Sequence, residues 1–194
     1  MAETFTAEIH IGGCVPLKQA AALSKVIADA HVEVNWGAGR FWPRRATDLL
    51  EHLQRVGNVS VLRLCDDQAS WGEFGDLESF LVRHRIPFNR FTEGKWEYAP
   101  QLVVYRPGAP VRALDTNTQC EPIVPTTGLD KILAQLMDAQ RAIKQGKSPT
   151  ALKYQRLALR QLKRLLPAPI RPLPTFEIAP AVTRKSSRTA SRRE

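Results

Sequence analysis

The alternation of apolar and polar residues predicts the first strands. Residues 4–11 alternate strictly between apolar and polar side chains, which is typical of a strand with one face in a core and the other in water. The same alternation recurs over residues 31–37, and a nearly continuous apolar run over residues 59–65 predicts a central strand. A hairpin that turns at Glu93-Gly94 and a strand over residues 102–106 complete the predicted sheet.

Helical spacing separates these strands. Apolar residues recur at helical intervals over residues 16–30, over residues 45–56 and near residues 74–83, which gives the order βαβαβαβββ. A doubly wound parallel sheet buries both of its faces, whereas the alternating strands here keep one face wet. The pattern therefore favours an α+β domain with a mixed sheet and helices mainly on one face; a three-layer α/β domain is the alternative.

The second half of the chain has a different organisation. A Pro-rich stretch over residues 109–126 predicts an extended connector, and two helices over residues 129–145 and 148–166 follow with only a short turn between them. Such helices form an antiparallel hairpin. The remaining residues are rich in proline and then in arginine and serine, which predicts a disordered tail. The expected divisions are residues 1–108, 109–126, 127–166 and 167–194.

Charge is distributed unevenly between the two parts. Residues 1–110 carry 12 Lys+Arg and 13 Asp+Glu, whereas residues 111–194 carry 16 Lys+Arg and 6 Asp+Glu. Essentially all of the net charge of +9 thus lies in the C-terminal part. Such asymmetry indicates an attached segment that contacts an anionic partner; the alternative is a solvated tail that keeps the protein soluble.

The helix over residues 148–166 concentrates this charge on one edge. At 100° per residue its cations fall within one sector and its apolar residues fall within another, which defines a basic amphipathic helix. The apolar face has three alternative uses: packing on the preceding helix, lying on an anionic membrane, or docking in a partner's groove. The matching apolar stripe of residues 129–145 favours packing, which leaves a basic ridge for phosphate groups. The ridge residues are Lys153, Arg156, Arg160, Lys163 and Arg164, and the tail adds Arg184, Lys185, Arg188, Arg192 and Arg193.

Polar residues on the wet face of the sheet predict a second candidate site. If both alternating strands turn their apolar faces to the helices, Glu8 and His10 share a side with Glu33 and Asn35, and Arg63 joins them. A histidine, carboxylates and an amide in one place suit acid–base chemistry or a polar ligand, although polar side chains also cover the wet face of any sheet.

The pair Asp66-Asp67 is a third candidate, because it comes where the apolar run of residues 59–65 ends. Carboxylates at a strand end suit a hard metal ion, with Glu73 as a further ligand, and they equally suit an Asx turn or a helix cap. No metal-binding spacing, phosphate-binding glycine motif or cofactor motif accompanies them. We therefore predict no metal site, no cofactor and no catalytic residue.

The remaining features indicate the cellular location and the class of function. No apolar run reaches the ~20 residues that a membrane span needs, and the N-terminus lacks the pattern of a secretory signal. Three cysteines far apart in the sequence fit reduced thiols, so we expect a cytoplasmic protein without membrane contact. The favoured function is a non-enzymatic binding or adaptor protein whose basic C-terminal part contacts DNA or RNA, largely without sequence specificity. The alternatives are a module that binds an acidic protein and a small enzyme that uses His10 or Asp66/Asp67.

Overall fold

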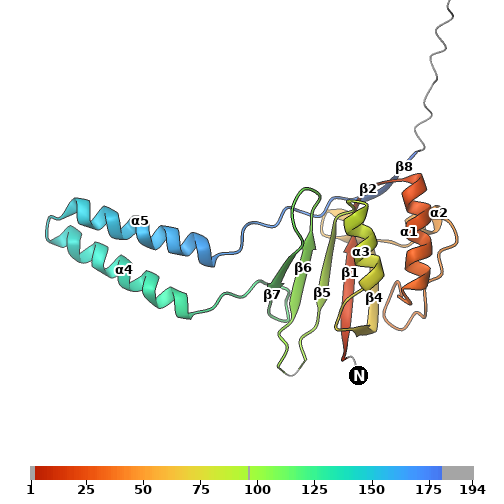
Figure 1. The fold of residues 1–194 in the computed structure, drawn as a ribbon, viewed down its shortest axis with the longest axis horizontal. Coiled ribbons are helices and arrows are strands. Elements are labelled where there is room, and N and C mark those ends of the chain that lie inside the picture. Colours follow the sequence, from red (N-terminus) through yellow and green to blue (C-terminus); the bar gives the residue numbers. More distant parts are fainter. Residues whose placement is uncertain (1–2, 96, 181–194) are drawn as a thin grey trace, which may run out of the picture.

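The computed structural model describes residues 3–95 and 97–180, which form an α+β body and a projecting helical hairpin (Figure 1). The body is built on a six-stranded sheet in the order β3-β4-β1-β5-β6-β7, and β2 and β8 form a separate pair. The strands are β1 (Thr4–Ile11), β2 (Gly13–Pro16), β3 (Leu53–Val56), β4 (Val59–Ser70), β5 (Phe88–Thr92), β6 (Gln101–Tyr105), β7 (Arg112–Asp115) and β8 (Phe176–Ala179). The α+β prediction is therefore confirmed.

The prediction that the main sheet is mixed is wrong, because every neighbouring pair in it is antiparallel. The extra strand β3 reverses the chain just before β4, so β4 returns antiparallel to β1. Strands β4 and β5 run in the same direction on either side of β1, with α3 (Gly75–Arg83) in the connection between them. β4 and β5 are therefore parallel to each other but not adjacent, because β1 lies between them.

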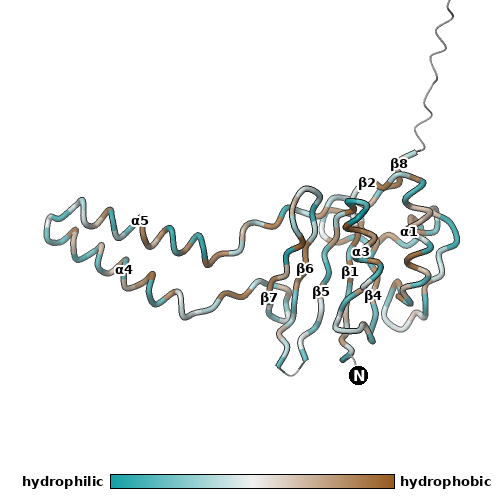
Figure 2. The backbone as a smooth tube through the Cα atoms, in the orientation of Figure 1, coloured by the Kyte–Doolittle hydropathy of each residue, from teal (hydrophilic) through white to brown (hydrophobic). Residues whose placement is uncertain are grey.

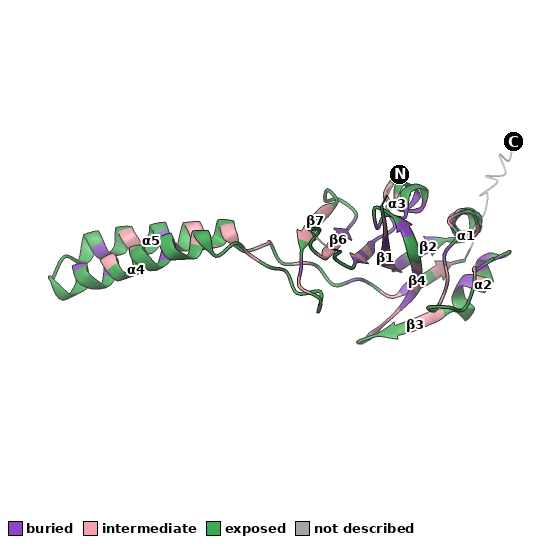
Figure 3. Cartoon of the chain, turned by 90° about the horizontal axis from the view of Figure 1, so that it is seen from below, coloured by how far each residue is buried: buried purple, intermediate pink, exposed green. Residues whose placement is uncertain are grey.

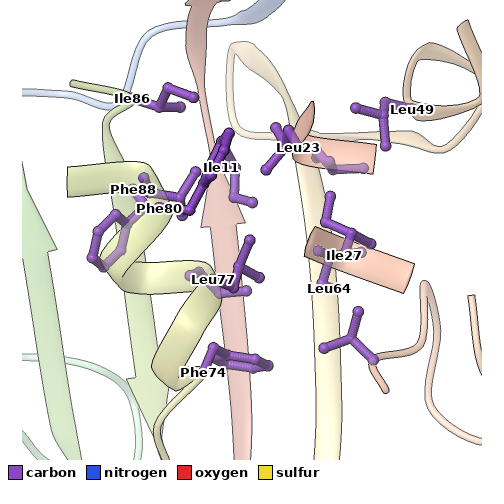
Figure 4. Close-up of a cluster of buried hydrophobic side chains, with 14 of the residues drawn as sticks. Ile11, Leu23, Ile27, Leu49, Leu64, Phe74, Leu77, Phe80, Ile86 and Phe88 are labelled. Carbon is purple, nitrogen blue, oxygen red and sulfur yellow. The ribbon is translucent and has the colours of Figure 1, made fainter. Parts of the chain in front are cut away.

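The helices α1 (Leu17–Asp29), α2 (Ala46–Glu51) and α3 cover one face of the sheet. The alternation in β1 turns Ile9 and Ile11 toward this face, where both are fully buried. Figure 4 shows Leu23 and Ile27 of α1, and beside them Leu77 and Phe80 of α3, packed around Ile11 of β1. One continuous apolar core joins the three helices to the sheet, so the prediction of helices on one face is also confirmed.

Two predicted elements change in the region before β4. Residues 31–37 form no regular strand; only Glu33 bridges to Cys65 on β4 and to Arg40. The predicted helix over residues 45–56 ends at Glu51, and the chain then becomes β3. Leu53 pairs with Leu62 on β4, so pairing with a neighbouring strand overrides the helical spacing of these leucines.

The hairpin between β5 and β6 is longer at its turn than predicted. Residues 93–100 connect the two strands, with a single bridge between Lys95 and Tyr98. The Glu93-Gly94 pair therefore opens a longer loop instead of closing a tight turn, and residues 101–105 form the second arm.

The Pro-rich segments are more ordered than predicted. The connector contributes β7, which pairs with the edge strand β6, and the start of the tail contributes β8, which pairs with β2 in parallel. Arg106 and Arg112 donate hydrogen bonds to the backbone carbonyls of Arg171 and Ala168, at 3.0 Å each. Residues 167–180 are thus bound across the body. The rest of the predicted disordered tail, residues 181–194, lies outside the described residues.

The predicted helical hairpin is confirmed. Helix α4 (Thr127–Lys144) and helix α5 (Ser148–Leu165) are joined by a short turn in which Gly146 has a φ of 71°. The two helices pack along each other and extend away from the sheet (Figures 1 and 3). Two connecting segments, one from β7 to α4 and one from α5 to β8, attach this hairpin to the body.

Among residues 3–95 and 97–180, no helix combines the length and the apolar character that crossing a membrane requires.

Candidate functional site

A polar cluster occupies the wet face of the sheet, where the sequence predicted one. The register between β1 and β4 places His10 directly opposite Arg63. The Glu8 carboxylate accepts a hydrogen bond from the Arg63 guanidinium through one oxygen and is hydrogen-bonded to His10 Nε2 through the other. All three side chains are about one-fifth exposed. The structure therefore brings these three predicted residues into direct contact.

The cluster continues through Gln54 of β3, which the sequence did not indicate. Arg63 Nη1 donates to Gln54 Oε1 at 3.3 Å, and Gln54 Nε2 donates to Asn35 Oδ1 at 3.0 Å. Asn35 is thus connected to the cluster through Gln54. No sequence signal marks Gln54, because residues 53–56 have the spacing of a helix.

Glu33 is separate from this cluster. Its backbone N–H and C=O pair with Cys65 on β4, at 2.9 Å each. Its carboxylate accepts the N–H of Gly37 at 2.7 Å and so closes its own turn. Burial raises the pKa of the neighbouring Cys65 thiol to about 11, so this thiol is protonated at neutral pH.

The electrostatics of the cluster define its chemistry. Burial of the Glu8 carboxylate favours its neutral form, but hydrogen bonds and charges from His10 and Arg63 outweigh burial and lower the pKa of Glu8 to about 2. The hydrogen bond to Glu8 in turn raises the pKa of Arg63. A general base works best with a pKa near the working pH. Glu8 is far from that range, so the arrangement suits a structural ion pair.

Asp66 and Asp67 do not form a joint site. Both lie inside β4, which is longer than its apolar run, and neighbouring residues of a strand point to opposite faces. Asp66 accepts the N–H of Gln68 at 2.8 Å and lines a cavity of about 260 Å³ with Glu73, between α1 and α3. Asp67 lines a different cavity beside Thr4 and Thr6. In the part of the chain that the structure describes, no three His, Cys, Asp or Glu residues are grouped so that they could hold a metal ion.

The basic edge of α5 places five cations on one side of the helix. We use this name for five residues that are all exposed: Lys153, Arg156, Arg160, Lys163 and Arg164. Small side chains, among them Ala151 and Ala158, face α4 and are buried. The cations therefore lie on the opposite edge of the helix. Within residues 3–95 and 97–180 none of the five forms an ion pair, since the hairpin's ion pair joins Arg141 to Asp138 of α4 at 3.2 Å.

The five predicted tail cations, Arg184, Lys185, Arg188, Arg192 and Arg193, lie outside the described residues.

Comparisons with protein-family models, with curated proteins and with solved structures gave no match for this chain.

Proposed function

We propose that the chain is a non-enzymatic binding protein that contacts nucleic acid through the basic edge of α5, largely without reading sequence. The single observation that supports this proposal is the row of five exposed cations without ion-pair partners in the described chain. Residues 153–164 extend for roughly 16 Å along the helix, enough to face several backbone phosphates at once.

The kind of side chain on this edge suits phosphate groups. Three of the five cations are arginines, whose planar guanidinium group binds phosphate oxygens through two parallel hydrogen bonds. Contacts to phosphates position a protein on nucleic acid but carry no sequence information. The edge offers no aromatic residue for base stacking, so affinity would come mainly from charge.

We place this activity in the cytoplasm. The support is that Cys14, Cys65 and Cys120 are all free thiols, as expected in a reducing compartment.

The test is the salt dependence of binding to labelled duplex DNA and to labelled single-stranded RNA, measured with the full chain. A variant with Arg156, Arg160, Lys163 and Arg164 all changed to Gln removes four cations from the edge and leaves the tail intact. Each neutralised duplex phosphate adds about 0.9 to the magnitude of the slope of log K against log salt. In this variant the magnitude of the slope should therefore decrease by up to about 3.6. Its affinity should fall by orders of magnitude at about 50 mM salt.

A matched control removes the same charge from the rest of the hairpin. Lys131, Arg141, Lys144 and Lys147 are also exposed but lie on α4 and in the turn. Changing these four to Gln should lower affinity much less. Equal losses in both variants would show a general charge effect and contradict a site on α5. If the wild-type chain binds neither probe at low salt, the proposal fails, and an acidic protein becomes the partner to seek.

A further inference from the structure

The helical hairpin has an apolar face that no other described part of the chain covers. Its large side chains are 39–59% exposed and are distributed over both helices. Figure 2 shows hydrophobic positions recurring along α4 and α5, and Figure 3 shows that most of the hairpin is exposed. We call this surface the leucine face; it consists of Leu129, Leu133, Leu136, Ile143, Leu152, Leu159 and Leu166.

The spacing of the leucine face is that of a helix bundle. Leu129, Leu136 and Ile143 are seven residues apart on α4, and three leucines at residues 152, 159 and 166 are seven apart on α5 and its end. Sevenfold spacing of apolar residues keeps one side of a helix directed at a partner helix over several turns. A pocket that binds one side chain of a partner does not require apolar residues at sevenfold spacing.

Both stripes lie on the same side of the hairpin. Three members of the face directly follow a residue that packs against the other helix: Leu129 follows Gly128, Leu152 follows Ala151, and Leu159 follows Ala158. Each of these leucines points 100° round its helix from the residue that faces the other helix. Because the two helices run antiparallel, this rotation directs the leucines of both helices to the same side of the hairpin. The seven residues therefore form one continuous surface.

The contact between α4 and α5 is made by small residues, so it buries little apolar area. Ala139, Ala142, Ala151 and Ala158 are buried there, and a Cβ on Gly128 would lie 2.7 Å from the Leu165 side chain. Ile132 of α4 is also buried, and Leu165 lies against Gly128, but the seven residues of the leucine face point away from this contact. Helices in proteins owe most of their stability to burial of an apolar face, and in this hairpin that face is the uncovered one.

We propose that the leucine face binds the leucine face of a second copy of this chain, so that two hairpins form a four-helix bundle. The exposed area supports this occupant: the seven residues expose on the order of 600 Å², which approaches the ~800 Å² that each partner buries in a standard interface. Two antiparallel helices with matched stripes are half of a four-helix bundle, and a twofold axis supplies an identical half.

The distribution of charge is compatible with this pairing. The seven residues of the leucine face are uncharged, but Arg156 and Lys163 follow Leu152 and Leu159 by four residues, so these two cations border the face. The other three cations of the basic edge, Lys153, Arg160 and Arg164, lie farther round the helix and stay in water. Each hairpin nevertheless carries 9 Lys+Arg and 2 Asp+Glu over residues 127–166, so the two copies repel each other at low salt. Dimerisation should strengthen as salt rises, whereas phosphate binding should weaken.

The experiment is the mass of the full chain in solution, by light scattering coupled to size exclusion and by sedimentation, over a range of protein and salt concentrations. Wild-type chain should reach twice its mass of 21.7 kDa, more completely at higher salt. The double variant Leu133→Gln with Leu159→Gln should remain monomeric at concentrations where the wild type is dimeric. The pair Leu133→Ala with Leu159→Ala should weaken the dimer at least tenfold, with helix formation favoured by alanine.

A matched control is Leu157→Gln, because Leu157 is an exposed leucine of α5 that lies outside the leucine face. It should leave the dimer unchanged, and circular dichroism should show the same helix content in every variant. A wild-type chain that stays monomeric under all conditions overturns the proposal, as does a dimer that both double variants leave intact. Neither result bears on nucleic-acid binding, which is measured with its own variants.

Discussion

At the scale of single residues, the ion pairs of Glu8 stabilise the centre of the sheet. A carboxyl whose pKa is lowered on folding adds stability above its unfolded pKa, and this stability is lost as the pH falls through the folded value. For Glu8 the folded pKa is about 2 and the ordinary value is 4.5. Its contribution is therefore complete above about pH 5 and disappears toward pH 2.

We predict that Glu8→Gln lowers the free energy of unfolding by about 2 kcal/mol at pH 7, because it removes the charge that holds His10 and Arg63. Urea denaturation measures this loss. The difference from wild type should shrink as the pH falls from 5 to 2. Glu51→Gln, on an exposed position of α2, is the control and should change little. A loss that is the same at pH 7 and pH 2 would show that packing, and not charge, is responsible.

At the scale of elements, the sequence predicted those that depend on their own pattern. The alternation of β1 and the apolar stripes of the hairpin helices are local, and both elements form as expected. Because β1 was placed correctly, Glu8 and His10 were also assigned to the right face. Arg63 followed from the same reasoning applied to β4.

The elements that were missed depend on pairing with another strand, either the next one or a distant one. Leu53–Val56 continues the spacing of a helix and becomes a strand only because β4 lies beside it. β4 extends through Asp66 and Asp67 because β1 continues to Thr4 and pairs with Ser70. β8 follows a run of prolines, and its partner β2 is far away in the sequence. Pairing between remote segments leaves no periodic signal in either, so β8 could not be read from the sequence, whereas β3 is joined to β4 by the two-residue turn Gly57-Asn58, which is a local hairpin signal.

One such remote contact requires a glycine. A Cβ on Gly12 would lie 2.1 Å from the carbonyl oxygen of Pro174 and 2.9 Å from the Leu173 side chain. We predict that Gly12→Ala destabilises the chain by about 3 kcal/mol in urea denaturation, because a backbone atom must move. In a chain that ends at Pro172 the obstructing atoms are gone, and the same substitution should have almost no effect. An equal loss of stability in both chains would show that the strain does not arise from contact with residues 173 and 174.

At the scale of the whole molecule, the body and the hairpin differ in how they are stabilised. The body has a continuous core between the sheet and three helices, whereas α4 and α5 pack mainly on each other. Local stability follows buried apolar contacts, so the hairpin should open more easily than the body as long as the leucine face is uncovered.

We predict that hydrogen exchange separates the two parts. Amides of β1 and β4 should exchange at the same slow rate at every protein concentration. Amides of α4 and α5 should exchange faster in dilute solution and slow down as concentration rises, because a second copy covers the leucine face. Exchange in the hairpin that does not depend on concentration would be incompatible with this account.

The pairing of β2 with β8 also determines when the body can be completed during synthesis. A ribosome releases Gly13–Pro16 early and Phe176–Ala179 only after the whole hairpin. Phe176 is 1% exposed in the core, beside an equally buried Val15. Until β8 emerges, this part of the core remains open, although the sheet and hairpin are already made. A chain broken anywhere before Phe176 therefore exposes apolar surface on the body, which distinguishes an unfinished product from a complete one.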